Sequence, residues 1–189
     1  MAVAKKQAVK KTVIDDNEGM KKASKTKKDP AMKEENITSG KYEDIHFVDS
    51  TKNVWNYSLL TDELVRNFQA GTLYNAYDYL GSHEVEVLGK RGYYFAVWAP
   101  NATAVSVKGN FNNWKNNEYA LYVRIDNSGI WEGFIPEFPK GEVYKYRIKG
   151  YKGVEIDKGD PYANFWEKRP LTASITWELG YGWNDESWM

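Results

Sequence analysis

The stretch Gly92-Tyr-Tyr-Phe-Ala-Val-Trp-Ala-Pro-Asn101 and the run after it, Ala104-Val-Ser-Val-Lys-Gly-Asn-Phe-Asn-Asn-Trp114, decide the fold of this chain. The first run is apolar or aromatic at almost every position up to Ala99, so we predict a β-strand that is covered on both faces. Pro100 and Asn101 end this strand, because proline cannot donate to a β-ladder and asparagine favours turns.

The second run alternates as a strand does when one of its faces is buried and the other is solvated. Val105 and Val107 point to one side of the strand, and Ser106 and Lys108 point to the other. A polar, asparagine-rich turn follows and carries Trp114 at its end. A tryptophan in such a turn either closes one end of the folded domain or offers a flat surface to a ligand.

Strand-like segments continue on both sides of this pair. The further predicted strands are Val85–Leu88, Tyr119–Ile125, Ile130–Ile135, Val143–Lys149, a weaker one near Val154–Asp157, and Thr172–Trp177. Turn residues separate them at Gly89-Lys-Arg91, Asp126-Asn-Ser-Gly129 and Pro139-Lys-Gly141. Short strands with turns at this spacing predict an all-β fold, an antiparallel β-sandwich.

A short helical preamble is predicted before the strands, within residues 41–84. Thr61 can cap a helix over Asp62–Gln69, and the acids of its first turn favour the positive end of the helix dipole. Gly71 fits the position just beyond the end of this helix, and one more helical turn is expected to end at Gly81.

The amino-terminal residues 1–40 have a different composition from the rest. Residues 1–36 hold ten lysines and six acids, although the whole chain balances 26 basic residues against 26 acidic ones. Such a segment cannot bury enough apolar surface to offset the entropy of ordering, so we predict that it is disordered. The alternative is an arm that binds nucleic acid or a membrane surface. No arginine or aromatic residue is interleaved with the lysines, and we therefore expect neither partner.

Composition also narrows the chemistry. Cysteine is absent, which excludes disulfides and thiolate chemistry, and no apolar run has the length of a membrane span or a secretory signal. The two histidines, His46 and His83, lie far apart in sequence. We expect a cytoplasmic chain that has no metal or cofactor.

The carboxylates of the predicted sandwich do not form an obvious catalytic pair. Most of them fall in turns or on solvated strand faces, and none is expected to ionise abnormally; they are Glu118, Asp126, Glu132, Glu137, Glu142 and Asp160. Glycoside chemistry needs two carboxylates across one sugar bond. We therefore expect the chain by itself to be non-catalytic.

Several motifs in one order resemble the family 48 carbohydrate-binding module, an immunoglobulin-like sandwich found in front of α-glucan-processing barrels. The motifs are FAVWAPNA, VSVKGNFNNW, GIWEGFIP, GEVYKYRI, DPYA at Asp160–Ala163 and YGWNDESWM at Tyr181–Met189. Together they are similar to the amino-terminal regions of bacterial 1,4-α-glucan (glycogen) branching enzymes, over about Phe68 to Met189.

The resemblance implies a layout and a role. Residues 1–40 would be the disordered tail, 41–84 the helical preamble, 85–180 the immunoglobulin-like module, and 181–189 the junction to a catalytic barrel that is absent from this chain. The parent protein would transfer an α-1,4-glucan segment to a 6-hydroxyl by a retaining mechanism, and this module would hold glucan and support the barrel.

The same resemblance places a glucan site on named residues. The family's tryptophan and lysine fall on Trp114 and Lys145, and Asn112 and Asn113 flank the tryptophan with amides that can bind sugar hydroxyls. Related modules have a second tryptophan where this chain has Tyr151-Lys152, so Tyr151 is the candidate second platform. The alternatives are a buried plug for Trp114 and a solvated strand face for Lys145.

Aromatic residues gather near the carboxyl end in greater number than this sandwich can cover. Tyr162, Trp166, Trp177, Trp183 and Trp188 are therefore predicted to face the catalytic barrel of the same polypeptide. Other readings remain: a self-standing glycogen-targeting module, the module of a debranching or trehalose-forming enzyme, or an immunoglobulin-like domain that binds proteins.

Overall fold

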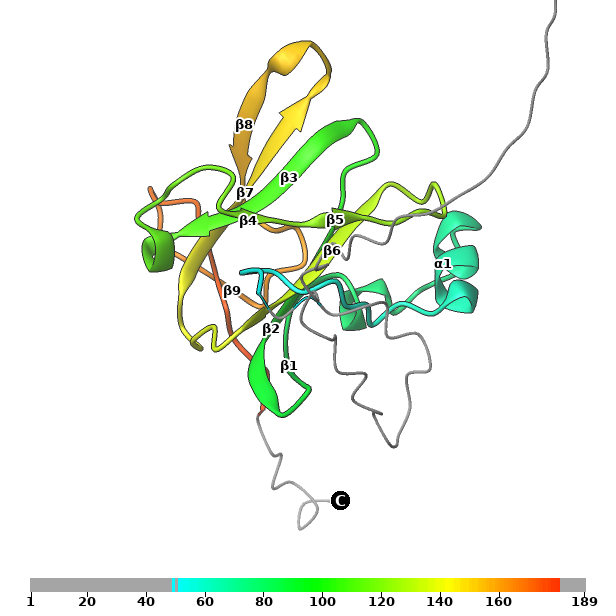
Figure 1. Cartoon of the computed structure of the whole chain (residues 1–189), viewed down its shortest axis with the longest axis horizontal. Coiled ribbons are helices and arrows are strands. Elements are labelled where there is room, and N and C mark those ends of the chain that lie inside the picture. Colours follow the sequence, from blue (N-terminus) through cyan, green and yellow to red (C-terminus); the bar gives the residue numbers. More distant parts are fainter. Residues whose placement is uncertain (1–48, 50, 181–189) are drawn as a thin grey trace, which may run out of the picture. The chain divides into compact units, whose positions relative to one another are not determined.

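The computed structural model describes residue 49 and residues 51–180 (Figure 1). The predicted tail over residues 1–40 and the predicted junction over 181–189 lie outside these residues. The helices are α1 (Asp62–Gln69) and the short 3-10 turns η1 (Ala76–Asp78), η2 (Asn110–Asn112) and η3 (Tyr151–Gly153). The strands are β1 (Gly81–Val87), β2 (Lys90–Trp98), β3 (Ala102–Gly109), β4 (Tyr119–Ala120), β5 (Tyr122–Val123), β6 (Ile130–Pro136), β7 (Val143–Gly150), β8 (Glu155–Lys158), β9 (Phe165–Trp166) and β10 (Ser174–Ile175).

The strands form two antiparallel sheets, which confirms the predicted all-β sandwich. The first sheet has the order β1-β2-β6-β5, and the second has the order β4-β3-β7-β10-β9 with β8 also paired to β7. In Figure 1 the β7–β8 hairpin projects at the top, and the β1–β2 hairpin projects at the bottom. The preamble and α1 belong to the side of the first sheet.

Strand β2 is apolar on both sides because each side has its own core. Tyr93, Phe95 and Val97 pack toward the second sheet, together with residues such as Val107 and Tyr146. The alternate residues Tyr94 and Ala96 pack under the preamble; their cluster also contains Trp55, Tyr57, Leu59, Leu60, Val65, Leu80, Val87, Ile130 and Phe134. The strand predicted to be covered on both faces is therefore confirmed.

The preamble forms as its sequence predicts. Thr61 accepts a hydrogen bond at Oγ1 from the backbone N–H of Leu64, 3.3 Å away, and caps α1. Leu60 and Val65 are both buried on either side of this cap, which fixes the angle at which the chain enters the helix. Gly71, just past the helix, has a φ of 72°, a conformation that glycine adopts without steric cost.

Three predicted strands differ clearly from the structure. The strand expected over Thr172–Trp177 is reduced to β10, Ser174–Ile175. The strand expected to begin at Val85 begins at Gly81, because the polar residues before Val85 also pair with β2. Its turn is Leu88-Gly89, both with positive φ, and the residues after Gly89 already belong to β2. Positive φ at both central residues is typical of a type I′ turn, the two-residue hairpin loop whose twist matches that of the flanking strands.

The segment Tyr119–Ile125, predicted as one strand, crosses between the sheets. Its first part, β4, pairs with β3 in the second sheet, and its second part, β5, pairs with β6 in the first. Leu121 lies between the two parts, and its backbone N–H donates to the carbonyl oxygen of Val105 at 2.9 Å. Alternation therefore ends at the crossing, and Ile125 is 93% exposed.

A buried ion pair ties the preamble to the first sheet. Arg124 Nη1 lies 2.7 Å from Glu132 Oε1, and Arg124 Nε lies 2.7 Å from Asp126 Oδ2. The other oxygen of Glu132 accepts hydrogen bonds from the hydroxyls of Ser58, at 2.8 Å, and Tyr94, at 2.6 Å. Every charge of the group thus has a partner, and the ion pair replaces water inside the fold.

Two carboxyl groups were expected to be unremarkable and are instead buried. Glu132 is 4% exposed, and Asp160 is 0% exposed beside the hydroxyls of Tyr144 and Tyr146. Burial raises the pKa of both carboxyl groups above their ordinary values. The expectation was wrong for Glu132 because a strand residue under a covering segment looks solvated when the cover is not known. It was wrong for Asp160 because a loop residue looks solvated when its distant tyrosine partners are not known.

Removal of Glu132 tests the importance of the ion pair. Glu132→Ala leaves the Arg124 guanidinium buried without its main partner, so we expect a loss of about 3–5 kcal/mol in the free energy of unfolding. Urea denaturation measures the loss, and Glu118→Ala, an exposed acid, is the matched control with almost no effect. A loss below about 1 kcal/mol for Glu132→Ala would show that the pair does not hold the preamble in place.

Candidate functional site

The candidate site begins where β3 ends, at Gly109. A Cβ atom at this position would lie 1.9 Å from the carbonyl oxygen of Val143 in β7. Only glycine therefore permits the close approach of the two strands at this point. The chain then leaves the sheet through η2 and the asparagine-rich turn.

Asn112 holds this turn together. Its Oδ1 accepts a hydrogen bond from the N–H of Gly109 at 3.0 Å, and its Nδ2 donates to the carbonyl oxygen of Lys115 at 3.1 Å. The residue is only 5% exposed. Both polar atoms are used inside the protein, so the structure removes Asn112 from the residues offered to a sugar and gives it a structural role.

Trp114 sits in an unusual backbone conformation. Asn113 and Trp114 have φ values of 52° and 58°, in the left-handed region. Asparagine tolerates this region, but for a tryptophan it costs about 1–2 kcal/mol. The N–H of Trp114 donates to Gly109 O at 2.8 Å, and its indole Nε1 donates to Asn110 Oδ1 at 2.8 Å. Leu88 and Glu137 adopt the same left-handed conformation in turns, so the backbone of Trp114 fixes where the side chain projects but does not by itself mark a functional position.

Phe111, and not Trp114, closes this end of the sandwich. Its ring lies 4.6 Å from that of Phe138 and 4.9 Å from that of Tyr119, measured between centroids, and it packs on the main core. Trp114 is half-buried and belongs to neither core cluster. Of the two alternatives for Trp114, the structure therefore does not support a plug for the sandwich end, because Phe111 fills that place.

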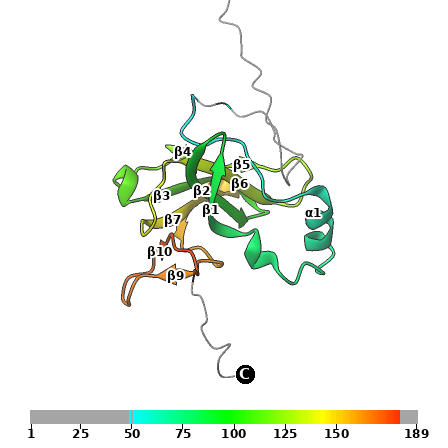
Figure 2. The same ribbon diagram turned by 90° about the horizontal axis from the view of Figure 1, so that it is seen from below.

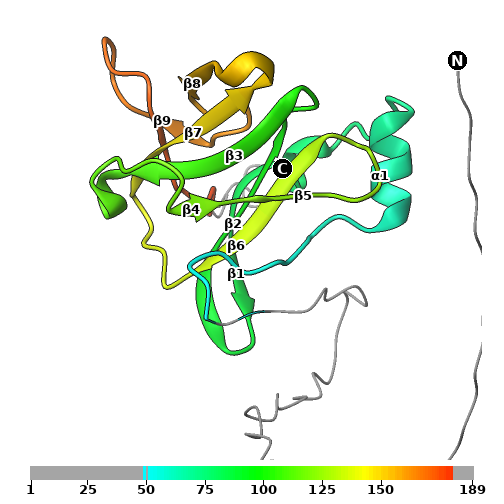
Figure 3. The ribbon, with the colours of Figure 1, turned by 45° about the horizontal axis from the view of Figure 1, so that its top comes forward.

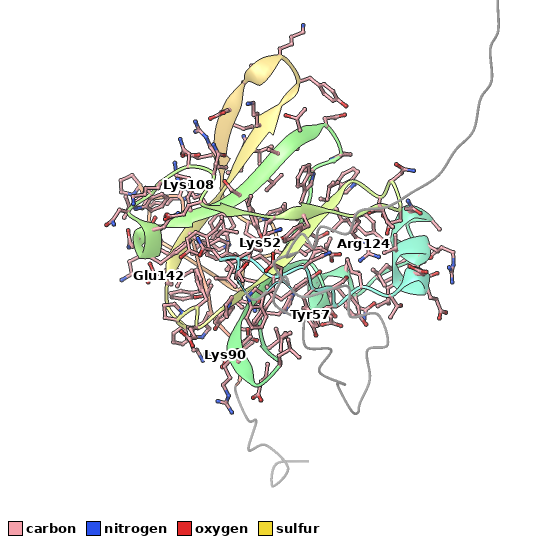
Figure 4. All side chains as sticks on the ribbon, in the orientation of Figure 1. Lys52, Tyr57, Lys90, Lys108, Arg124 and Glu142 are labelled. Carbon is pink, nitrogen blue, oxygen red and sulfur yellow. The ribbon has the colours of Figure 1, made fainter. Side chains whose placement is uncertain are left out.

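Lys108 lies beside the indole of Trp114. Its ammonium nitrogen is 6.0 Å from the centroid of the ring, 2.9 Å from Asn116 Oδ1 and 3.1 Å from Asp157 Oδ2. Its side chain is only 9% exposed. Figure 4 shows Lys108 at the η2 end of the second sheet, far from Arg124.

Asp157 connects this lysine to the β7–β8 hairpin. Its other oxygen, Oδ1, accepts a hydrogen bond from Arg147 Nη1 at 3.0 Å. Burial by itself would raise the pKa of Asp157, but the hydrogen bonds from Lys108 and Arg147 and their charges lower it below its ordinary value. The group is thus an ionised carboxylate with two cationic partners.

Lys145 lies on the same face as Lys108. The two residues are direct partners across β3 and β7, and directly paired residues point to the same side of a sheet. Lys145 Nζ donates to Thr172 Oγ1 at 2.8 Å. We call the surface formed by Trp114, Lys108, Lys145 and Thr172 the Trp114 face.

The structure does not bring Tyr151 to this face. Tyr151 is 70% exposed, but it begins η3 at the tip of the β7–β8 hairpin. Gly150 pairs with Ala102, at the start of β3, whereas Trp114 follows the other end of β3. Eight residues of strand separate these ends by roughly 23 Å. Figures 1 and 3 show η2 and the hairpin tip well apart, so Tyr151 is not a second platform next to Trp114.

The predicted aromatic surface near the carboxyl end is partly present. Trp166 and Trp177 are 43% and 42% exposed, on the segment of β9 and β10 seen at the lower left in Figure 2. Tyr162 instead packs against the core cluster under the preamble. Trp183 and Trp188 lie outside the described residues.

Some residues of these surfaces were not found from the sequence. Lys108 was assigned only to a solvated strand face, because its partner Asp157 lies 49 residues away. Phe165, 52% exposed with its ring centroid 5.7 Å from that of Trp177, joins the aromatic surface. Strand β9, which contains Phe165, was not predicted, because a strand of two residues is too short to show an alternating pattern in the sequence.

Within the part of the chain that the structure describes, no three histidine or carboxylate side chains come together as a metal site requires. His83 has its Nε2 within 3.1 Å of the carbonyl oxygen of Leu80. No helix among the described residues is long and apolar enough to cross a membrane.

Part of this chain matches a known family of protein modules. Residues 79–163 match the family model described as "Carbohydrate-binding module 48 (Isoamylase N-terminal domain)". Proteins named 1,4-alpha-glucan branching enzyme GlgB are similar: that of Trichodesmium erythraeum is 46% identical over 131 residues, covering 69% of this chain and 17% of its own length. That of Aquifex aeolicus is 46% identical over 133 residues, covering 70% and 21%.

This chain spans about a fifth of the length of the curated relatives it matches. Among solved structures, a pullulanase from Anoxybacillus sp. LM18-11 in complex with maltotriose is 21% identical, with a TM-score of 0.45 over 63% of this chain and 15% of its own.

The charge of Asp157 should make part of the stability depend on pH. Because its pKa is lowered in the folded state, its contribution is present above its unfolded pKa and is lost as the pH falls through the folded value. We expect Asp157→Asn to cost on the order of 1 kcal/mol at neutral pH, since the side chain is partly exposed and screened. Urea denaturation of both proteins should show this difference shrinking below about pH 4.

The exposed acid Glu118 supplies the matched control for this experiment. Glu118→Gln removes one negative charge without touching Lys108, so its effect should be close to zero at every pH. A difference between Asp157→Asn and the wild type that is the same at acidic and neutral pH would contradict the assigned ion pairs.

Proposed function

We propose that this chain, whose residues 79–163 form a carbohydrate-binding module of family 48, binds α-glucan on the Trp114 face as part of a 1,4-α-glucan branching enzyme. The family match and the branching-enzyme relatives support the substrate class. The geometry of the second sheet supports the choice of face.

The observation that carries this assignment is the half-buried indole of Trp114 in a left-handed backbone. The same backbone conformation occurs at Leu88 in a hairpin turn, so the support comes from the position of the ring, which is part-exposed and outside both core clusters. A sugar ring has an apolar face that can stack on an indole and a rim of hydroxyl groups that need hydrogen-bond partners. The indole N–H is already bonded to Asn110, so the ring, and not its polar edge, is what Trp114 offers.

Polar groups around the indole suit the rim of a sugar. Asn113 is exposed next to Trp114, and its amide can both donate and accept. Lys145 Nζ carries three donors and uses one for Thr172 in the described structure. Lys145 is the cross-strand partner of Lys108, which lies beside the indole, so we expect one short stretch of glucan to reach Lys145 together with the indole.

The larger enzyme is part of the same proposal. Branching would cut an α-1,4-glucan and rejoin it to a 6-hydroxyl, with two carboxylates on either side of the sugar bond. In the relatives, most of the length lies outside the region that this chain matches. The module would therefore hold the glucan while another part of the enzyme, in the cytoplasm, performs the transfer.

The exposed aromatic group of Phe165, Trp166 and Trp177 would support that other part. The ring centroids of Phe165 and Trp177 lie 5.7 Å apart, and Lys140 places its Nζ 4.6 Å from the ring centroid of Trp177. Trp166 is the next residue of β9 and points to the opposite side, where its ring lies against Gly159. Exposed aromatic clusters of this kind are typical of protein interfaces. We assign this surface to contact with the catalytic barrel, and neither nucleic acid nor membrane is expected as a partner.

Loss of the indole should remove sugar binding and leave the fold intact. One stacking ring with a few hydrogen bonds gives weak affinity, so we expect the wild-type chain to bind maltoheptaose with a Kd of roughly 0.1–1 mM. Trp114→Ala should bind too weakly to measure by calorimetric titration. The free energy of unfolding should change by less than about 1 kcal/mol, because Phe111 and not Trp114 fills the core.

Tyr74→Ala is the matched control, since Tyr74 is 87% exposed in the preamble, away from the Trp114 face. It should bind maltoheptaose as the wild type does. Tyr151→Ala decides whether the glucan extends along β7 to the hairpin tip, and we expect wild-type affinity there too. Two results together would contradict the proposal: the wild-type chain does not bind malto-oligosaccharides, and Trp114→Ala is destabilised by about 3–5 kcal/mol. Trp114 would then be a structural residue, and this face would hold no glucan site.

A further inference from the structure

We propose that Lys108 is a positioning residue for the glucan platform: it holds the Trp114 indole so that one face is covered and the opposite face is offered to the sugar. The inference rests on the proposed glucan binding at the Trp114 face. It adds a residue that strand alternation assigned only to a solvated surface, and it gives that residue a defined task.

The lysine is unusually well fixed for a lysine on the outer face of a sheet. Asn116 comes from the turn after Trp114, and Asp157 comes from β8, so two different segments bind its ammonium group. Lysine side chains are almost never buried unless they are paired, and this one is 9% exposed. Its flexible stem has therefore lost most of its freedom before any ligand arrives.

Two interactions of the indole are defined, one at its edge and one at its face. Asn110 binds only the Nε1 edge of the ring, and neither core cluster includes the tryptophan. The cation of Lys108, 6.0 Å from the ring centroid, is attracted by the electron-rich face of the indole. With the edge and one face held, the ring keeps its orientation, and the sugar does not have to order it on binding.

The electrostatic surroundings make a clean test possible. Asp157 would keep Arg147 as a partner, at 3.0 Å, if the charge of Lys108 were removed. Asn116 is exposed and would bind water instead. A Lys108→Met variant keeps the apolar stem and leaves no buried charge without a partner, so we expect it to fold.

The alternative is that Lys108 only stabilises the sheet and has no effect on the indole. The two views differ in what they predict for Trp114 itself. If Lys108 holds the ring, its loss increases the access of acrylamide to Trp114 in the free protein. If it only stabilises the sheet, the access stays the same and only the melting temperature changes.

The experiment uses the full 189-residue chain and maltoheptaose. For Lys108→Met we expect affinity by calorimetric titration to fall about three- to tenfold, the cost of ordering one side chain on binding. The Trp114 part of the fluorescence, taken as the difference from a Trp114→Phe variant in each background, should become more easily quenched. Lys108→Arg keeps a cation that stacks on aromatic rings and should restore most of the affinity.

Lys149→Met is the matched control, because it also removes one lysine from the outer face of the second sheet. Lys149 lies in β7, at the end of the sheet that is far from Trp114. This variant should change neither affinity nor quenching. Asn116→Ala, a milder change in an exposed turn, loosens one anchor of Lys108 and should lower affinity about two- to threefold even if Lys108→Met does not fold.

The outcomes separate this inference from the proposed function. Suppose that the wild-type chain binds maltoheptaose and that a folded Lys108→Met variant binds it equally well. This result overturns the role of Lys108 and leaves the glucan site in place. If Lys108→Met is unfolded, unchanged affinity in Asn116→Ala leads to the same conclusion. An equal loss in Lys149→Met shows an unspecific charge effect and also overturns it. A wild-type chain that does not bind maltoheptaose contradicts the proposed function, and the role of Lys108 falls with it.

Discussion

The close approach of β3 to β7 at Gly109 is the constraint on which the functional side of the molecule depends. No side chain fits between Gly109 and the carbonyl oxygen of Val143, so the two strands stay paired up to the last residue of β3. The chain must then turn sharply, and Asn112 closes that turn with both of its polar atoms. The turn ends in two left-handed residues, and the second of them is Trp114. A tryptophan thus stands outside the core, at a place set by the backbone.

Buried ion pairs and hydrogen bonds inside the molecule explain why the preamble is part of the fold. Arg124 and Glu132 form a buried ion pair, and Ser58 brings the preamble into the same group of hydrogen bonds. On the other side, Asp160 receives the hydroxyls of Tyr144 and Tyr146 beneath the second sheet. The family match begins at residue 79, yet residues of the preamble before it pack on Tyr94 and Ala96 of β2. We therefore expect the module to need the preamble for its stability.

The sequence predicted the features that depend on neighbouring residues, and it did not predict the contacts between residues far apart in the chain. Cap chemistry placed α1 at Asp62–Gln69, and hydrophobic patterning placed β2 and β3, because both depend on neighbours in the chain. The crossing of Tyr119–Ile125 between sheets has no such local sign. The resemblance led to Trp114, but it also put Asn112 and Tyr151 beside the sugar. The structure commits the first to a turn and places the second at the other end of β7. The contact of Lys108 with Asp157 depends on the register of β3, β7 and β8, which no single segment encodes.

We infer that glucan stacks on the exposed face of one indole at the end of β3, and NMR tests this stacking most directly. Titration of the full chain with maltoheptaose, with the indole N–H signal of Trp114 assigned from a Trp114→Phe variant, reports which residues the sugar reaches. The account predicts saturable shifts of the Trp114 indole and the Asn113 amide, while the Tyr151 amide stays in place. Shifts confined to Tyr151 or to Trp177, with the Trp114 signals unmoved, would contradict it.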